Sequence, residues 1–169
     1  MTSKGRPDSK AAAASIRGKG RGLKVGVIVS RFNEEITKRL LEGALEGLAE
    51  AGVKKRSQKV LSVPGSFELA GAAKKLAQSG KVDAVVCLGA VIKGESEHFT
   101  FVASAAQQGI LQAGLETGIP ITFGVLTVEN IDQALARSGG ADGNSGYEAA
   151  LDAVEMANLY QQIEGVRGE

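Results

Sequence analysis

The chain has 169 residues, the size of one ordinary domain, and needs neither disulfides nor a structural metal to bury a core. Hydrophobic residues make up 43% of the chain, charged residues 23% and aromatic residues only 4%, and there are 23 glycines. Because aromatic residues are few and glycines many, we expect a tightly packed core of small aliphatic side chains. The single cysteine, Cys87, lies in an apolar run and excludes an internal disulfide. No stretch approaches the ~18 apolar residues of a membrane span. Together with the net charge of +1, these features favour a soluble intracellular protein.

Residues 1–22 form a basic leader in which six lysines and arginines accompany one aspartate. The leader contains glycine and alanine but no apolar periodicity, which is typical of a disordered tail. Its composition also resembles an organellar transit peptide, and a weak polyanion-binding arm is a further alternative, but it lacks the apolar segment of a secretory signal. We expect residues 23–169 to form the single domain, with neither nucleic acid nor membrane as a partner.

The first half of the domain alternates short β-branched runs with longer stretches of helical spacing, the pattern of βα units in a parallel sheet. We expect the first strand over residues 23–30 and a helix, apolar at every fourth position, from about Asn33 to a stop at Gly52. The second strand covers residues 58–63, and a helix follows from about 67 to 78.

The second half continues the pattern and adds a helical end. The third strand, residues 82–92, is apolar almost throughout, as expected for a central strand covered on both faces. A helix over 98–116 and a strand over 121–128 follow. A short helix around 130–138, the turn-rich stretch SGGADGNSG and a long helix over 146–163 complete the chain. The pattern predicts a three-layer α/β/α sandwich, flavodoxin-like, with a four-stranded parallel sheet.

Each predicted strand leads into a cluster unlike its own interior. The clusters are SRFNEE (30–35), VPGSFE (63–68), IKGESEH (92–98) and, less polar, TFGVLTVEN (122–130). Ligand sites in open parallel sheets lie beyond the carboxyl ends of the strands, where the clusters meet. Residues distant in the sequence are therefore expected to line one pocket.

Three phenylalanines, Phe32, Phe67 and Phe123, fall at or near these strand ends. Each ring can either complete the core or offer a flat stacking surface, and three rings at one edge favour a planar ligand. In the second cluster, Ser66 and Glu68 either contact the ligand or cap the following helix.

The third cluster holds the only histidine, His98, at the start of a helix. Ser96 is a reasonable N-cap, and the free N–H groups of the first turn form an anion site suited to phosphate. The positive helix end disfavours the imidazolium, so His98 is either a neutral base or a surface or capping residue. Because Glu95 and Glu97 repel phosphate, the site requires a nearby cation.

Lys93 and Arg137 are the candidate cations, and each can instead be a solvated surface charge. A divalent metal held by His98 with glutamates is a weaker alternative, because one histidine without fixed carboxylate spacing is no metal motif; we predict no metal site. The glycines form neither a P-loop nor a dinucleotide fingerprint.

Five motifs, in order and with compatible spacing, carry a resemblance to a known family: SRFN, VPGSFE, GAVIKGESEHF, PITFGVLT and GNSGYEAALDAVEMANL. They resemble those of the 6,7-dimethyl-8-ribityllumazine synthases, over about Leu23 to Leu159. The resemblance implies a transferase of riboflavin biosynthesis that joins 5-amino-6-(D-ribitylamino)uracil to 3,4-dihydroxy-2-butanone 4-phosphate, with loss of phosphate and water and without a cofactor.

The resemblance also implies residue roles. Phe32 matches the aromatic residue that stacks on the pyrimidine, and His98 matches the proton-transfer residue that serves Schiff-base formation and phosphate elimination. The remaining matches for the ribitylamino-uracil are Ser66, Phe67, Glu68, Ala90, Val91 and Ile92. Glu95 and Ser96, the latter where threonine is common, match the loop that receives the phosphate-bearing substrate.

Phe123 and Arg137 match residues that the family supplies from the adjacent subunit, the arginine for phosphate. Self-association into pentamers, with active sites at subunit interfaces, is therefore implied, and the short stretch 138–146 favours the 60-subunit icosahedral shell of some members. One departure is Ser145, where the family usually has lysine; its loss either weakens substrate binding or is covered by another base such as Lys93.

Three other functions stay open on the sequence. They are a non-catalytic flavin or pterin binder, a scaffold protein whose catalysis has decayed, and a riboflavin synthase of the related archaeal type. The presence of Glu68, His98 and Arg137 argues against decay, and the identity of the product separates the two enzymes.

Overall fold

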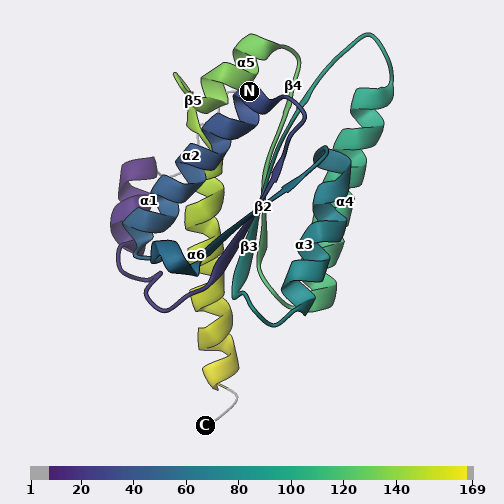
Figure 1. Cartoon of the computed structure of the whole chain (residues 1–169). Coiled ribbons are helices and arrows are strands. Elements are labelled where there is room, and N and C mark those ends of the chain that lie inside the picture. Colours follow the sequence, from purple (N-terminus) through teal and green to yellow (C-terminus); the bar gives the residue numbers. More distant parts are fainter. Residues whose placement is uncertain (1–7, 167–169) are drawn as a thin grey trace.

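A four-stranded parallel sheet forms the centre of the molecule in the computed structural model, which describes residues 8–166. The strands are β1 (Val25–Ser30), β2 (Gln58–Val63), β3 (Ala84–Ile92) and β4 (Ile121–Val128). They lie in the order β2-β1-β3-β4, and all three pairings are parallel (Figure 1). The predicted fold class is confirmed.

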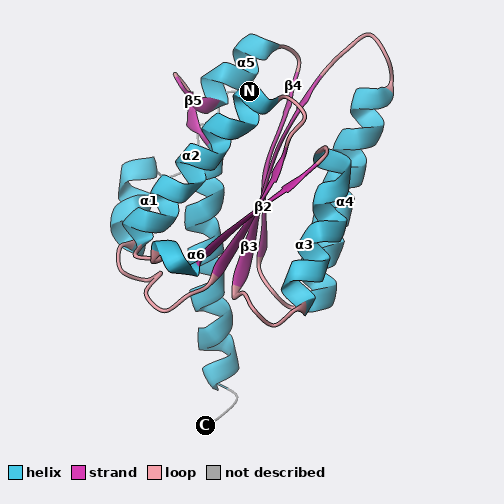
Figure 2. Ribbon diagram, viewed as in Figure 1, coloured by secondary structure: helices cyan, strands magenta, loops and turns pink. Residues whose placement is uncertain are grey.

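Helices cover both faces of this sheet and give the molecule three layers (Figure 2). One face carries α3 (Leu69–Gln78) and α4 (His98–Thr117), and the other carries α2 (Glu34–Ala51) and α6 (Ser145–Val166). The shorter helices α1 (Ser9–Ile16) and α5 (Ile131–Arg137) lie on the side of α2 and α6. Two 3₁₀ turns, η1 (Lys55–Ser57) and η2 (Ser66–Glu68), flank β2.

Each face of the sheet has its own core, because side chains alternate between the two faces along a strand. In β3, Val86 and Leu88 join the core beneath α2 and α6, whereas Val85 and Cys87 join the core beneath α3 and α4. Burial raises the pKa of the Cys87 thiol to about 12. The thiol is therefore protonated and inert, as the apolar run around it predicts.

Glycines let α2 and α6 approach closely. A side-chain carbon at Gly146 would overlap the carbonyl oxygen of Leu40, and one at Gly43 would overlap the Asn144 amide. Asn144 fixes this junction: its Oδ1 accepts the Gly146 N–H at 2.9 Å, and its Nδ2 donates to the Arg39 carbonyl at 2.9 Å. The start of α6 is thus held against α2.

The leader departs from its expectation over residues 8–22. Asp8 caps α1 by accepting the Lys10 N–H at 3.2 Å, and four consecutive alanines favour the helix. Ile16, only 4% exposed, packs into the core beneath α2 and α6. The prediction of disorder is wrong here, because one apolar anchor suffices to dock a short helix without visible periodicity. Residues 1–7 lie outside the described residues.

The stretch 138–146 also holds more structure than expected. It contains an antiparallel pair of short strands, β5 (Ser138–Gly140) and β6 (Gly143–Asn144), with positive φ at Gly139 and Gly143. Over residues 8–166, the helices are too short or too polar to cross a membrane.

Candidate active site

The candidate site lies where β3 extends past β1. The last parallel pair between these strands is Val29 with Leu88, whereas β3 stays paired with β4 as far as Ile92. The backbone of residues 89–92 therefore has no strand partner on the β1 side. Asn33, in a left-handed conformation with φ of 58°, fills part of this gap by donating its side-chain N–H to the Ala90 carbonyl at 2.8 Å.

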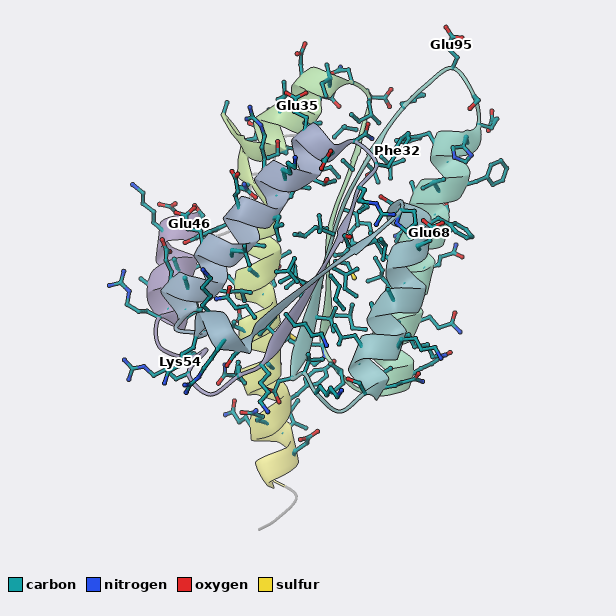
Figure 3. The ribbon with its side chains drawn as sticks, in the orientation of Figure 1. Phe32, Glu35, Glu46, Lys54, Glu68 and Glu95 are labelled. Atoms are coloured by element: carbon teal, nitrogen blue, oxygen red, sulfur yellow. The ribbon has the colours of Figure 1, made fainter. Side chains whose placement is uncertain are left out.

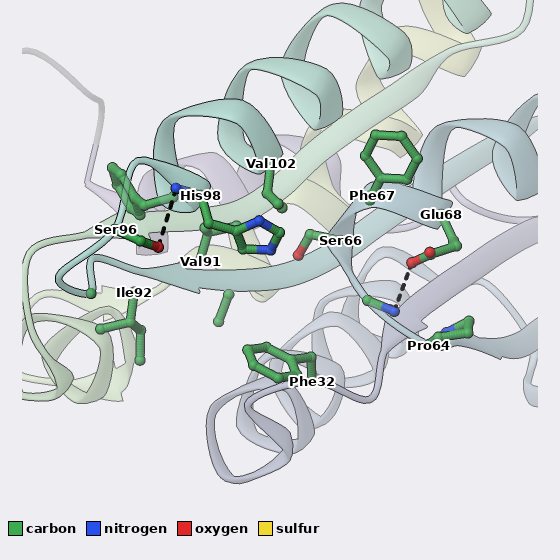
Figure 4. Close-up of a pocket in the computed structure, with 14 residues that line it drawn as sticks. Phe32, Pro64, Ser66, Phe67, Glu68, Val91, Ile92, Ser96, His98 and Val102 are labelled. Atoms are coloured by element: carbon green, nitrogen blue, oxygen red, sulfur yellow. Dashed lines mark hydrogen bonds between the residues drawn. The ribbon is translucent and has the colours of Figure 1, made fainter.

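A cavity of about 690 Å³ opens at this edge, a size suited to small-molecule substrates (Figure 4). Its lining residues come from the ends of β1, β2 and β3 and the start of α4. They are Phe32, Pro64, Gly65, Ser66, Phe67, Glu68, Ala90, Val91, Ile92, Gly94, Ser96, His98, Phe99 and Val102. Three of the predicted clusters therefore meet in one cavity.

Most of the predicted site residues line this cavity, and three do not. Glu95, Phe123 and Arg137 are absent from the lining. The lining residues outside the predicted set are Pro64, Gly65, Gly94, Phe99 and Val102. All of these except Val102 belong to the quoted motifs, and the helical spacing of Phe99 and Val102 indicates core residues as readily as cavity walls.

Two aromatic rings stand exposed at the cavity. The Phe32 ring is 71% exposed and the Phe67 ring 63%, so core packing is excluded for both. Backbone bonds from the N–H groups of Arg31 and Phe32 to the carbonyls of Val63 and Pro64, at 2.9 and 3.1 Å, tie the exit of β1 to the exit of β2. These bonds fix the loop that carries Phe32 next to the loop that carries Phe67.

Glu68 and Ser66 of VPGSFE differ in their contacts, which bear on whether each caps the helix or contacts the ligand. Glu68 acts as a cap, because its Oε2 accepts the Gly65 N–H at 3.0 Å, while its side chain still lines the cavity. Ser66 is 5% exposed and lies above Gly89 of β3, whose missing side chain makes room for the serine hydroxyl. In Figure 4, Ser66 lies between Phe67 and the His98 ring.

His98 is the first residue of α4, and its imidazole faces the cavity (Figure 4). Ser96 accepts the backbone N–H of His98 at 3.4 Å, but the N-cap of α4 is Glu97 and not the predicted Ser96, because the helix begins one residue later than an N-cap at Ser96 requires. A base held at the wall of a partly apolar cavity is placed to move a proton on a bound ligand.

The charged candidates lie away from the cavity. Glu95 is at the tip of the loop between β3 and α4 and points outward (Figure 3). Lys93 pairs with Glu129 at 3.3 Å. Arg137 ends α5, pairs with Asp142 at 3.6 Å and donates to the Gln133 carbonyl at 3.2 Å. Within its own chain, Arg137 does not reach the pocket lining.

The sequence pattern predicts the wrong position for Phe123 in its strand. It is the third residue of β4 and pairs with Cys87, well before the carboxyl end of the strand at Val128. The expectation that it lies near a strand end of its own chain is wrong, because β4 continues through the less polar cluster that was taken as its exit. The ring is 42% exposed on this edge strand.

Among residues 8–166, no three histidine, cysteine, aspartate or glutamate side chains come together in a way that could hold a metal ion.

The chain is similar to a known family and to a curated protein. The family model described as 6,7-dimethyl-8-ribityllumazine synthase matches residues 22–161. The chain is also similar to a curated 6,7-dimethyl-8-ribityllumazine synthase from Syntrophus aciditrophicus (strain SB), with 50% identity over 143 residues, which are 85% of this chain and 93% of the relative. The family match spans every strand of the sheet and every lining segment of the cavity.

Proposed function

We propose, from the premise that the chain belongs to the 6,7-dimethyl-8-ribityllumazine synthase family, that the cavity beyond β1 and β3 is its active site. The protein is a transferase of riboflavin biosynthesis. It condenses 5-amino-6-(D-ribitylamino)uracil with 3,4-dihydroxy-2-butanone 4-phosphate and releases phosphate and water. The observation that carries the proposal is the convergence of Phe32, Ser66 and His98 from three separate segments on one cavity.

The uracil substrate is assigned to the side of the cavity formed by β1, β2 and β3. The exposed Phe32 ring offers a flat apolar face, and covering it with a planar ligand removes apolar surface from water. The ribityl chain of this substrate is assigned to Ser66, Phe67 and Glu68. The strand end Ala90, Val91 and Ile92 offers backbone groups that no neighbouring strand uses on the β1 side, apart from the Ala90 carbonyl that Asn33 engages.

His98 is assigned the proton transfers. When the amine of one substrate attacks the ketone of the other, a proton must leave nitrogen and the carbonyl oxygen must leave as water; elimination of phosphate then removes a further proton from carbon. An imidazole serves both directions near neutral pH. The cavity supplies the rest by holding amine and ketone in contact.

Phosphate binding is assigned to the loop of Glu95 and Ser96, completed by Arg137 from a neighbouring copy. Arg137 lies on α5, on the side of the sheet that carries α2 and α6, whereas the cavity opens toward α4. A second subunit is therefore needed to bring a guanidinium to the phosphate, and the same holds for Phe123. Ser145, which begins α6, supplies no charge there.

Oligomerisation belongs to this proposal. On α4, the apolar residues Phe101, Leu111 and Leu115 are 70%, 64% and 76% exposed, and their spacing places them in one stripe along the helix. A second copy of the chain would cover such a stripe. Pentamers are the proposed unit, with a 60-subunit shell as the larger form. A cytoplasmic location is proposed as well and fits a chain whose one cysteine is unpaired.

The test is one assay with both substrates on the purified protein. We expect the absorbance of the lumazine product to rise together with released phosphate, the product mass to match 6,7-dimethyl-8-ribityllumazine, and light scattering to give at least a pentamer. Binding of flavin without turnover would favour a non-catalytic binder. Conversion of lumazine into riboflavin would favour the archaeal type of synthase.

A further inference from the structure

Ser30 is a buried polar residue that the proposed chemistry leaves without a role. It is the last residue of β1, 1% exposed, directly before the loop that carries Phe32. Within residues 8–166, its Oγ is the one buried side-chain nitrogen or oxygen that has no hydrogen-bond partner. A buried hydroxyl without a partner is less favourable than the methyl group of alanine at the same place. Ser30 therefore offers unused hydrogen-bonding capacity at the edge of the active site.

The position of Ser30 connects it to Ser66. A side-chain carbon at Gly89 would lie 2.5 Å from the Ser66 Oγ and 3.3 Å from the Ser30 Oγ. The two hydroxyls therefore converge on the space above the bare backbone of Gly89. Ser66 lines the cavity whereas Ser30 does not, so an effect of Ser30 on a ligand has to pass through a lining residue such as Ser66.

We propose that Ser30 is a positioning residue for the uracil substrate. When that substrate fills the cavity, the Ser30 hydroxyl donates a hydrogen bond to the Ser66 Oγ and directs the Ser66 proton toward a substrate oxygen. A serine hydroxyl accepts and donates at once, so this bond leaves the Ser66 proton for the substrate. In this proposal the bond forms by rotation of the serine side chains, as active-site bonds tighten when substrate enters. The inference rests on the proposed function.

The test compares Ser30→Ala with the unmodified enzyme in steady-state kinetics, with each substrate varied in turn. We expect KM for the ribitylamino-uracil to rise about threefold to tenfold, the loss of one neutral hydrogen bond. The turnover number and KM for the butanone phosphate should stay unchanged. Because the variant removes an unpartnered hydroxyl, its thermal unfolding midpoint should be equal or higher. In a Ser66→Ala background, Ser30→Ala should have no further effect.

Ser79→Ala is the matched control, since the Ser79 hydroxyl donates to the Leu76 carbonyl at 2.6 Å at the end of α3, away from the cavity. It should lower the unfolding midpoint and leave both KM values unchanged. Calorimetric titration of the ribitylamino-uracil alone gives the same comparison where a variant turns over too slowly.

An unchanged KM in Ser30→Ala would overturn the role of Ser30, and so would an effect that persists in the Ser66→Ala background. A lower unfolding midpoint with both substrates affected would show a structural role and also reject the inference. Absence of condensation in the unmodified enzyme would instead reject the proposed function, so the two failures are distinguishable.

Discussion

His98 combines two separate local functions at the first position of α4. Its backbone N–H donates to the Ser96 hydroxyl just before the helix, while its imidazole faces the cavity. Removing the side chain therefore leaves this backbone bond in place. Arg137, by contrast, has its partners Gln133 and Asp142 within its own helix and hairpin, and in the proposed assembly it is a second copy that brings it to substrate.

For His98→Ala we expect turnover to fall roughly 10- to 100-fold, because orientation of the substrates by the cavity remains. This loss is at or below the low end of the rate effects of a positioned acid–base group. The measurement is the turnover number at saturating substrates. Sedimentation velocity should give the same particle size as the unmodified protein. Unchanged turnover would contradict the proton-transfer role.

For Arg137→Ala we expect KM for the butanone phosphate to rise roughly tenfold or more, as for the loss of a charge-assisted bond to phosphate. The KM for the ribitylamino-uracil should not change. The exposed ion pair with Asp142 contributes little stability, so the unfolding midpoint is a control that should stay within a few degrees. An equal loss for both substrates would argue against a phosphate contact.

Among the elements, the junction of α2 and α6 determines where the active-site loop lies. The loop with Phe32 leads directly into α2, and α2 is held by its close contact with α6 at Gly43 and Gly146. Space at these glycines is taken up by backbone and by the Asn144 amide, neither of which can yield easily. The position of Phe32 is thus supported from the far side of the sheet.

Gly146→Ala should lower the free energy of unfolding by about 1–3 kcal/mol or more, because the new methyl group would overlap the Leu40 carbonyl oxygen. Urea unfolding measures the change. Gly71→Ala is the control: Gly71 is an exposed helical position in α3 with no atom near the added carbon, so stability should be unchanged or rise by about 0.5–1 kcal/mol. Equal effects of the two substitutions would contradict the close-packing account.

Local signals predicted the elements well, and long-range relations were the part that sequence reasoning missed. Gly52 ends α2 with a φ of 97°, as its position after a periodic helix predicts. The docking of Ile16 depends on a surface made by distant helices, which no local pattern reveals. The predicted position of Phe123 was wrong, because polar residues mark the end of a strand only where the strand stops. The separation of Arg137 from its own cavity follows from the layers of the sandwich.

For the whole molecule, one chain holds a cavity but not every residue assigned to the site. Arg137 and Phe123 lie outside the cavity lining, and α4 presents an apolar stripe of Phe101, Leu111 and Leu115. Association of copies would both cover the apolar stripe and supply the missing side chains. Assembly and activity should therefore be lost together.

Replacing Leu111 and Leu115 together by lysine should break up the oligomer, because two charges would be buried in an apolar contact. We expect light scattering to show smaller particles and activity per chain to fall at least roughly 10-fold, since the phosphate site loses its guanidinium. Ile163→Lys, at an exposed apolar position near the end of α6, is the control and should change neither quantity. Full activity of a monomer would contradict the shared site.

The order of the cavity residues and α6 along the chain has a consequence for synthesis of the protein. All residues that line the cavity fall between Phe32 and Val102, so they are translated long before the 22 residues of α6. Until α6 docks, Val86 and Leu88 of β3 lack their cover and α2 lacks its partner. The nascent chain therefore carries the full set of cavity residues before α6 is made, and we expect docking of α6 to precede the association of copies that the proposed site requires.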